Sequence, residues 1–211
     1  MENSHFDVFI VGGGQAGPPL ASALAGAGKR VGLAERKYLG GSCINFGCTP
    51  TKAAIASARV AQLVRRAGEF GLRIPLVEVD FPAVLARAKE IVLKSRNGLE
   101  TWLAATGNLT LLRGHARFEG RNGDGFRLRV GEAQVTAAQV VLDTGTRSLI
   151  PPIDGLDEID FLDAGNWLDR PQLPGRLVVI GGGYRLGDGA ILPAPGQRCR
   201  GCRGRRADRR T

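Results

Sequence analysis

Two cysteines that could carry out redox chemistry, Cys43 and Cys48, lie five positions apart in a glycine-rich stretch, residues 40–52. An Ala-rich helical pattern follows, and Pro50 fits its first turn, because a proline there costs the helix no hydrogen bond. The positive end of a helix dipole favours thiolate over thiol, which makes a sulfur nucleophilic near neutral pH. If the loop curls back, the two Cα atoms come within disulfide range. The pair therefore predicts a short-loop, reducible disulfide.

Two other uses of these cysteines are compatible with their spacing. They could be buried thiols that act as small apolar residues, or they could form half of a zinc site. Zinc would need two further ligands, and His5 and His115 do not have a suitable spacing. Redox chemistry is therefore the preferred interpretation, and no metal site is predicted.

A second glycine-rich stretch, near the N-terminus, has the spacing of a dinucleotide-binding turn. Gly12, Gly14 and Gly17 form G-x-G-x-x-G, and Glu35 follows 21 residues after Gly14. The glycines would allow a tight turn, close approach of a pyrophosphate and close helix–strand packing, and the acid would accept hydrogen bonds from ribose hydroxyls. The alternative is a tight turn without a ligand. The flanking pattern predicts a buried strand, a helix and a second strand, at residues 6–11, 18–27 and 30–34.

The rest of the first 150 residues reads as scaffold. Helical patterns cover residues 53–66, with Ile55, Val60, Leu63 and Val64 as a core stripe, and residues 81–103. Alternating segments then predict a small antiparallel meander, followed by an apolar strand that ends in a Thr-Gly turn. The meander strands are predicted at residues 109–112, 116–118, 126–130 and 134–136, and the last strand with its turn at residues 139–147.

The stretch G-G-S-C-I-N-F-G-C-T-P-T-K resembles the redox-active disulfide motif of the FAD-dependent pyridine nucleotide-disulfide oxidoreductases. This family includes dihydrolipoamide dehydrogenase, glutathione reductase and mercuric reductase, and G-Q-A-G-P-P-L-A looks most like the mercuric reductase branch. Ser42 replaces the usual Thr, and Thr49 replaces an aliphatic residue. The resemblance implies that Cys43 exchanges with substrate and that Cys48 lies beside the flavin. Lys52, one helical turn later, would stabilise negative charge on the reduced flavin.

The same resemblance implies two cofactors. The first glycine turn would hold the ADP part of FAD, and a second one would hold NAD(P)H. Asp143 stands where the family has a small or amide residue, which leaves its contact open. The implied FAD-binding residues are Gly12, Gly14, Gln15, Ala16, Gly17, Glu35, Arg36, Gly41, Ser42, Thr144 and Gly145, and the implied NAD(P)H-binding residues are Gly181 and Gly183.

The second glycine turn breaks off after Tyr184. The family continues Y-I-G-L-E, whereas this chain continues Arg185-Leu186-Gly187-Asp188 and then becomes rich in Gly, Pro and Arg. We hypothesise a reading-frame slip after Tyr184. Codons compatible with the tail can spell Y-I-G-L-E-M-G in another frame and reach an acid 21 residues after Gly183, the spacing seen between Gly14 and Glu35. The nucleotide sequence of the gene tests this hypothesis.

Most of the positive charge lies in this tail. Residues 185–211 carry eight arginines and two aspartates, +6 of the net charge of +9. One alternative is that the tail binds nucleic acid or uses Cys199-x-x-Cys202 for a metal or for redox chemistry. No second cysteine pair or aromatic platform supports it, so no nucleic-acid partner is predicted. Without a long apolar run or a signal peptide, a cytoplasmic protein without a membrane partner is expected.

These patterns predict an α/β fold, and the resemblance implies which cofactor each domain binds. A Rossmann-like FAD-binding domain with a parallel sheet and an inserted meander covers residues 1–150, the start of a second, NAD(P)-binding Rossmann domain covers 151–184, and a disordered tail covers 185–211. The resemblance implies electron transfer from NAD(P)H through FAD to the Cys43–Cys48 disulfide and on to a small-molecule, thiol/disulfide or metal-ion substrate. Full-length members are homodimers, and this chain is expected to be a fragment incapable of full turnover. A non-catalytic flavin-binding remnant is the main alternative.

Overall fold

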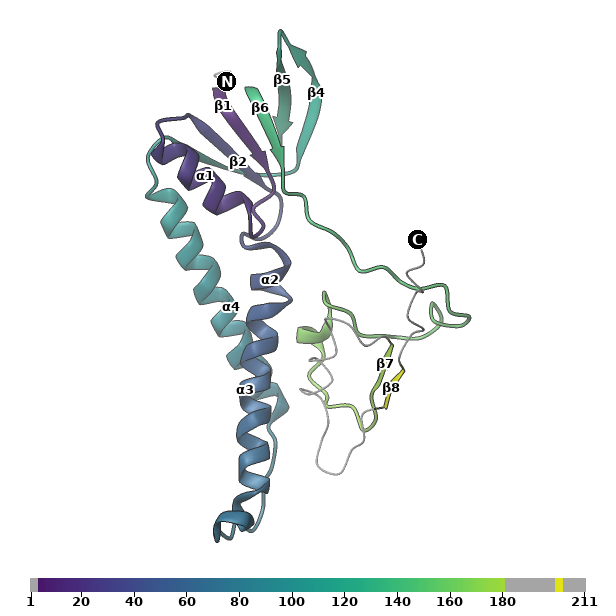
Figure 1. Cartoon of the computed structure of the whole chain (residues 1–211). Coiled ribbons are helices and arrows are strands. Elements are labelled where there is room, and N and C mark those ends of the chain that lie inside the picture. The colour runs from purple at the N-terminus through teal and green to yellow at the C-terminus, as the bar shows by residue number, and fades with distance from the viewer. Residues whose placement is uncertain (1–3, 181–199, 203–211) are drawn as a thin grey trace, which may run out of the picture. The chain divides into compact units, whose positions relative to one another are not determined.

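The computed structural model describes residues 4–180 and 200–202 (Figure 1). Contacts divide the chain into two compact units, residues 1–48 with 92–164 and residues 49–91 with 165–211. The first unit contains the sheet, the first glycine-rich stretch and residues 40–48 of the cysteine-containing stretch, whereas residues 49–52 belong to the second unit. The second contains most of one helix and the start of another.

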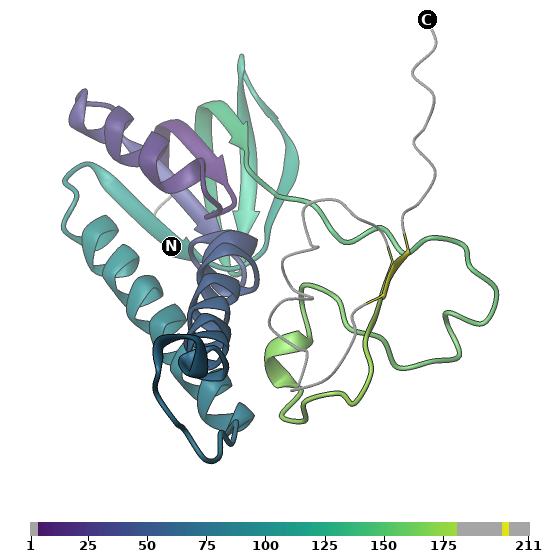
Figure 2. The same ribbon diagram turned by 60° about the horizontal axis from the view of Figure 1, so that its bottom comes forward.

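The first unit is built on a six-stranded sheet in the order β3-β2-β1-β6-β5-β4. β1 lies parallel to both β2 and β6, and β2 lies parallel to β3. β4, β5 and β6 form the antiparallel part, which stands at one edge (Figure 2). The α/β fold with a parallel sheet and an antiparallel extension is therefore confirmed. The strands are β1 Ser4–Val11, β2 Val31–Glu35, β3 Leu109–Arg113, β4 Ala116–Asn122, β5 Gly125–Val130 and β6 Ala133–Leu142.

The helices begin where the local sequence favours a start. α1 has two prolines in its first turn, where no hydrogen bond is lost. α4 follows Asp80, whose carboxylate accepts the N–H of Ala83 at 2.9 Å as a helix cap does. The helices are α1 Gly17–Gly26, α2 Gly41–Asn45, α3 Cys48–Arg65 and α4 Phe81–Ala104, with short 3₁₀ turns η1 Ala67–Phe70 and η2 Trp167–Asp169. None of the helices in the described ranges is sufficiently long and apolar to span a membrane.

β1 is the centre of the first unit because it is buried on both faces. Ile10 and Val8 pack with Ala21 and Ala25 of α1 on one face. Phe6 and Phe9 lie on the other, in a cluster that includes Leu128 of β5. Burial on both faces explains the nearly continuous apolar run of this strand, as predicted for a central parallel strand.

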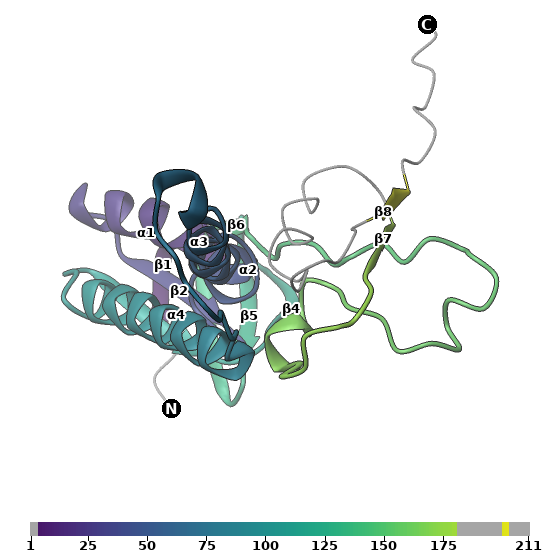
Figure 3. The ribbon, with the colours of Figure 1, turned by 90° about the horizontal axis from the view of Figure 1, so that it is seen from below.

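The second unit has its own small core. Ala53 and Ala54 of α3 lie against Phe81, Leu85 and Ala88 of α4, and the two helices run side by side (Figures 1 and 3). Trp167 and Leu168 of η2 complete the cluster. The stripe predicted on α3 is partly wrong, because Val60 and Leu63 are exposed, whereas Ile55 packs against the core.

Two strand predictions are wrong in their pairing. Residues 109–112 belong to β3, parallel to β2 at the sheet edge, and not to the meander. The chain leaves β2, runs through α3 and α4 and returns in the same direction, as a crossover connection requires. Residues 134–136 and 139–142 form one strand, β6, because the intervening Ala137 is buried and pairs with both Phe6 and Phe126.

The second glycine turn lies at the end of the described range. β7, Val178–Ile180, matches the apolar strand predicted before it, but Gly181 and Gly183 lie outside the described residues, as does most of the tail. Within the segment expected to lack regular structure, Arg200–Cys202 forms a short strand, β8, parallel to β7. The domain boundaries at residues 150 and 184 stay predictions.

A glycine in β2 tests the packing beside β1. A Cβ atom on Gly32 would collide with the ring of Phe9, whereas one on Gly26 in α1 would meet no atom within 4 Å. We expect Gly32→Ala to lower the free energy of unfolding by about 1–3 kcal/mol through overpacking. Gly26→Ala should leave it unchanged or raise it by up to about 1 kcal/mol. Urea unfolding of both variants measures this, and equal midpoints would contradict the packing described.

Candidate functional site

The first glycine turn joins β1 to α1 in a space too small for side chains. Gly12 has φ +109°, and a Cβ atom there would collide with the carbonyl oxygen of Asp143. A Cβ atom on Gly17 would collide with the carbonyl oxygen of Gly12. The outer two glycines of the motif are therefore required by the turn itself and by the close approach of α1 to the end of β1.

The middle of this turn faces two neighbours. A Cβ atom on Gly14 would lie 2.8 Å from a carboxylate oxygen of Asp143, and one on Gly41 would lie 2.9 Å from the Cα of Gly14. Gln15 and Ala16 are exposed and lead into α1. In the described part of the chain, the N–H groups of Gly14, Gln15 and Ala16 have no protein acceptor. They are the donors that a ligand at this turn would meet.

Glu35 ends β2 beside the same turn. One carboxylate oxygen accepts the N–H of Gly13 at 2.8 Å, and the other accepts the N–H of Lys37 at 2.7 Å. A carboxylate oxygen accepts more than one hydrogen bond, so these contacts leave room for a ribose hydroxyl. Arg36, also predicted to bind the cofactor, is exposed next to it.

Asp143 has a definite contact that sequence reasoning left open. It follows β6, and its N–H donates to the carbonyl oxygen of Val11 at 2.8 Å. Its carboxylate accepts the N–H of Gly17 at 2.8 Å, so it caps the N-terminus of α1 with a negative charge. Thr144 and Gly145 follow, and both are exposed.

The cysteine-containing stretch forms a second tight turn. Phe46 and Gly47 both donate their N–H groups to the carbonyl oxygen of Ser42, at 2.9 and 2.6 Å. This brings the chain back on itself, and a Cβ atom on Gly47 would lie 3.5 Å from the Cα of Cys43. We call residues 40–48 the cysteine turn and residues 12–17 the glycine turn.

The two cysteines occupy different helices. Cys43 lies in α2, a short helix that was not predicted, and Cys48 is the first residue of α3. The predicted helix start just before Pro50 is confirmed. Both cysteines are partly exposed, and their disulfide stays a prediction. Lys52, one turn after Cys48 in α3, and Ser42 in α2 are both exposed. The roles predicted for these two residues stay predictions.

The glycine turn and the cysteine turn are joined directly. The N–H of Gly40 donates to the carbonyl oxygen of Gly13 at 2.7 Å, and the side-chain amide of Gln15 donates to the carbonyl oxygen of Gly40 at 2.9 Å. In Figure 1, α2 lies at the ends of β1 and β2, where α1 begins. A ligand held by the glycine turn would therefore lie close to the turn that carries Cys43.

Sequence reasoning missed two residues that support the cysteine turn. Asn45 is buried within it, and Arg96 of α4 donates two hydrogen bonds to its side chain. Asn45 lies inside the glycine–cysteine stretch, which was a usable signal. Arg96 is 51 positions away in a helix read as scaffold, so the sequence held no local signal for it.

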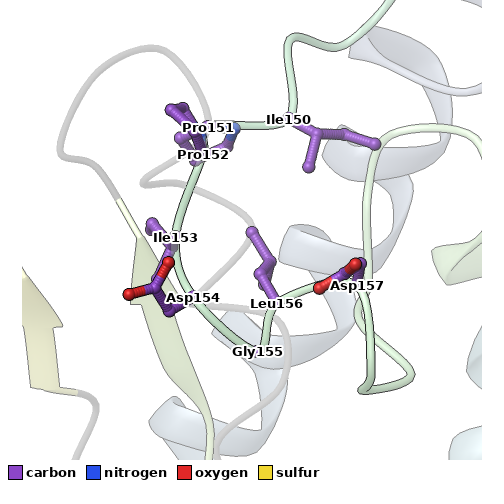
Figure 4. Close-up of a pocket in the computed structure, with 8 residues that line it drawn as sticks. All are labelled: Ile150, Pro151, Pro152, Ile153, Asp154, Gly155, Leu156 and Asp157. Atoms are coloured by element: carbon purple, nitrogen blue, oxygen red, sulfur yellow. The ribbon is translucent and has the colours of Figure 1, made fainter.

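A shallow hollow elsewhere in the first unit carries none of the predicted site residues. Residues 150–157 line it, and Figure 4 shows the side chains of Asp154 and Asp157 among apolar ones. No group of three or more His, Cys, Asp and Glu side chains gathers into a possible metal site within the described residues. The two joined turns remain the best candidate site.

Comparison with known proteins agrees with this geometry. Residues 6–185 match the protein family described as pyridine nucleotide-disulphide oxidoreductase. The mercuric reductase of Streptomyces lividans is 35% identical over 185 residues, which are 85% of this chain and 38% of that protein. The dihydrolipoyl dehydrogenase of Cupriavidus necator is 33% identical over 86% of this chain and 40% of its own length.

The solved structure of the HOCl-induced flavoprotein disulfide reductase RclA from Escherichia coli matches with a TM-score of 0.73 and 30% identity, over 88% of this chain and 39% of that one. The chain thus spans about two fifths of the length of each of these three relatives. Its fold, its two turns and the match over residues 6–185 make it a member of the pyridine nucleotide-disulphide oxidoreductase family.

Proposed function

We propose that this chain supplies the FAD-binding and dithiol parts of a disulfide oxidoreductase. Electrons from NAD(P)H would pass through FAD to the Cys43–Cys48 disulfide and on to a substrate. The family is FAD-dependent and uses NAD(P)H. The observation that carries the proposal is the pair of hydrogen bonds that joins the glycine turn to the cysteine turn, because electron transfer needs the cofactor beside the sulfurs.

The residues of the glycine turn fit the ADP part of FAD. Three successive N–H groups without a protein acceptor in the described structure, those of residues 14–16, lie at the positive, N-terminal end of α1, and anions bind well at such a position. Glu35 stands at the end of the neighbouring strand, where a ribose would be bound. Asp143 fits the anionic cofactor less well than these residues do, because its carboxylate already accepts the N–H of Gly17 at the same helix end. When bound, FAD would act as a carrier of two electrons.

The two cysteines would act as a dithiol. The Cys43 thiolate attacks a substrate disulfide, one substrate thiol leaves, and a mixed disulfide forms. The Cys48 thiolate then attacks Cys43, the second substrate thiol leaves, and the Cys43–Cys48 disulfide closes. Over the two attacks, two electrons pass to the substrate, and the two leaving sulfurs take up the two protons that the cysteine thiols lost on ionisation. Cys48 begins α3, where the helix dipole stabilises its thiolate form.

The substrate class follows from the same thiolates. They react with disulfides and also bind soft metal ions, so a mercuric reductase-like use on a metal-ion substrate is part of the proposal. The sequence of residues 14–21, G-Q-A-G-P-P-L-A, which covers the end of the glycine turn and the start of α1, favours this branch. Assembly as a homodimer and the NAD(P)H contacts of Gly181 and Gly183 are proposed from the family alone.

The disulfide is the first test. We expect a purified variant carrying Cys199→Ser and Cys202→Ser to close Cys43 to Cys48 in air and to release two thiols per chain on reduction with dithiothreitol. Alkylation before and after reduction, followed by peptide mass mapping, measures this. Adding Cys48→Ser should abolish the linked peptide. If the two sulfurs stay alkylatable in the FAD-loaded, air-oxidised protein, the proposed function is wrong.

Asp143 offers a test of the cofactor site. Asp143→Asn keeps an oxygen that accepts the N–H of Gly17 but removes a negative charge beside an anionic pyrophosphate. We expect FAD to bind about twofold to fivefold more tightly, since such a charge at a helix end is worth roughly 0.3–1 kcal/mol. The gain should shrink in high salt.

The control for this charge effect is Asp143→Ala, which removes both the charge and the cap. Losing the cap should lower the free energy of unfolding by about 1 kcal/mol, whereas Asp143→Asn should lose less. FAD fluorescence titrations at low and high salt and urea unfolding separate the two effects. Equal or weaker FAD binding by Asp143→Asn would rule out the repulsion.

A further inference from the structure

The cysteine turn is closed from within by the side chain of Asn45. This residue is only 2% exposed, and its amide nitrogen donates to the carbonyl oxygens of Leu39 and Gly41, at 2.9 and 2.8 Å. Gly41 begins α2, which carries Cys43 two residues later. The amide of Asn45 therefore sets where the helix that holds Cys43 begins.

The side-chain oxygen of Asn45 accepts its hydrogen bonds from a residue outside the cysteine turn. Arg96 of α4 donates from Nε at 3.0 Å and from Nη2 at 2.7 Å to the Asn45 side-chain oxygen. A guanidinium only donates and a carbonyl oxygen only accepts, so a single orientation of the amide satisfies all four hydrogen bonds. Arg96 is the partner that makes this orientation hold.

Arg96 is itself fixed in place by an aromatic ring. The carbon at the centre of its guanidinium lies 4.0 Å from the centre of the Tyr38 ring, a cation–π geometry. The Tyr38 ring in turn lies 6.2 Å from that of Phe46, which belongs to the cysteine turn. Arg96 therefore contacts the cysteine turn directly through Asn45 and is linked to it indirectly through Tyr38, whose ring lies beside that of Phe46.

We propose that Arg96 is a positioning residue for the Cys43–Cys48 pair. This inference rests on the proposed function, because it concerns the stability of the Cys43–Cys48 disulfide. By holding Asn45, Arg96 keeps the turn folded back so that Cys43 stays near Cys48, and a preorganised pair closes its disulfide more favourably than a loose one. Without Arg96, the buried oxygen of Asn45 loses its donors, which is costly enough to let the turn rearrange.

The role predicts a change in the redox equilibrium itself. In Arg96→Met, which keeps the length of the side chain but removes every donor, we expect the equilibrium constant for closing the disulfide to fall about tenfold. This corresponds to a reduction potential about 30 mV more oxidising. Arg96→Lys keeps a cation over Tyr38 and one donor and should lie between wild type and Arg96→Met.

Arg113→Met is the matched control. It removes the same charge, but the side chain of Arg113 forms an ion pair with Glu100 on the exposed surface, and no contact between it and the cysteine turn is found among the described residues. Its equilibrium constant should stay within about twofold of wild type. A purely structural Arg96 would lower the unfolding midpoint of its variants while leaving the equilibrium constant unchanged.

The measurement uses the full chain loaded with FAD, with Cys199 and Cys202 replaced by serine. Each variant is equilibrated in buffers of known ratios of reduced to oxidised dithiothreitol and then quenched with an alkylating reagent. The linked Cys43–Cys48 peptide is quantified by mass spectrometry. Bound FAD per chain is measured in parallel, to verify that the glycine turn is intact.

The outcomes are distinct. A tenfold loss in Arg96→Met, with Arg113→Met unchanged, supports the inference. Wild-type equilibrium constants in both Arg96 variants overturn it and leave the proposed function standing. A wild-type protein that never forms the disulfide refutes the proposed function instead. If Arg96→Met does not retain FAD, Arg96→Lys decides, since an unchanged constant there overturns the inference.

Discussion

The site depends on two turns whose main chains touch directly, with the Gln15 side chain as a second link between them. The N–H of Gly40 reaches the carbonyl oxygen of Gly13 at 2.7 Å only because residues on both sides of that hydrogen bond are glycines. A methyl group on Gly12, Gly17 or Gly40 would collide with a neighbour, and one on Gly14 or Gly41 would lie within 3 Å of one. Fixing these glycines costs conformational entropy, because glycine is the most flexible residue in the unfolded chain. Burial of apolar side chains in β1 and β2 can offset this cost.

The electrostatic environment of the glycine turn combines positive and negative charge. The end of α1 presents a partial positive charge, yet two carboxylates, of Glu35 and Asp143, already accept hydrogen bonds from Gly13 and Gly17. They hold the turn in shape before any ligand arrives. An anionic cofactor bound there would gain from the remaining N–H groups and would meet the charge of Asp143 at the same helix end. Preorganisation and repulsion would then act on the same few atoms.

Local patterns predicted the elements well where the pattern itself carries the physics. The apolar run of β1, the two prolines that start α1 and the proline in the first turn of α3 were all placed correctly. Pairing was harder, because periodicity does not say which strand a segment meets. Residues 109–112 alternate like a hairpin strand but lie parallel to β2, and residues on both sides of Ala137 form one strand.

By itself the sequence determined the spacing of Cys43 and Cys48, the glycine turn and the family resemblance, since these are local in the chain. Only the tertiary structure decided what surrounds them. The register that pairs Leu142 with Val11 delivers Asp143 to Gly17, 126 positions away, and the packing of α4 delivers Arg96 to Asn45. Contacts between distant residues depend on how whole elements pack, and no local pattern encodes that packing.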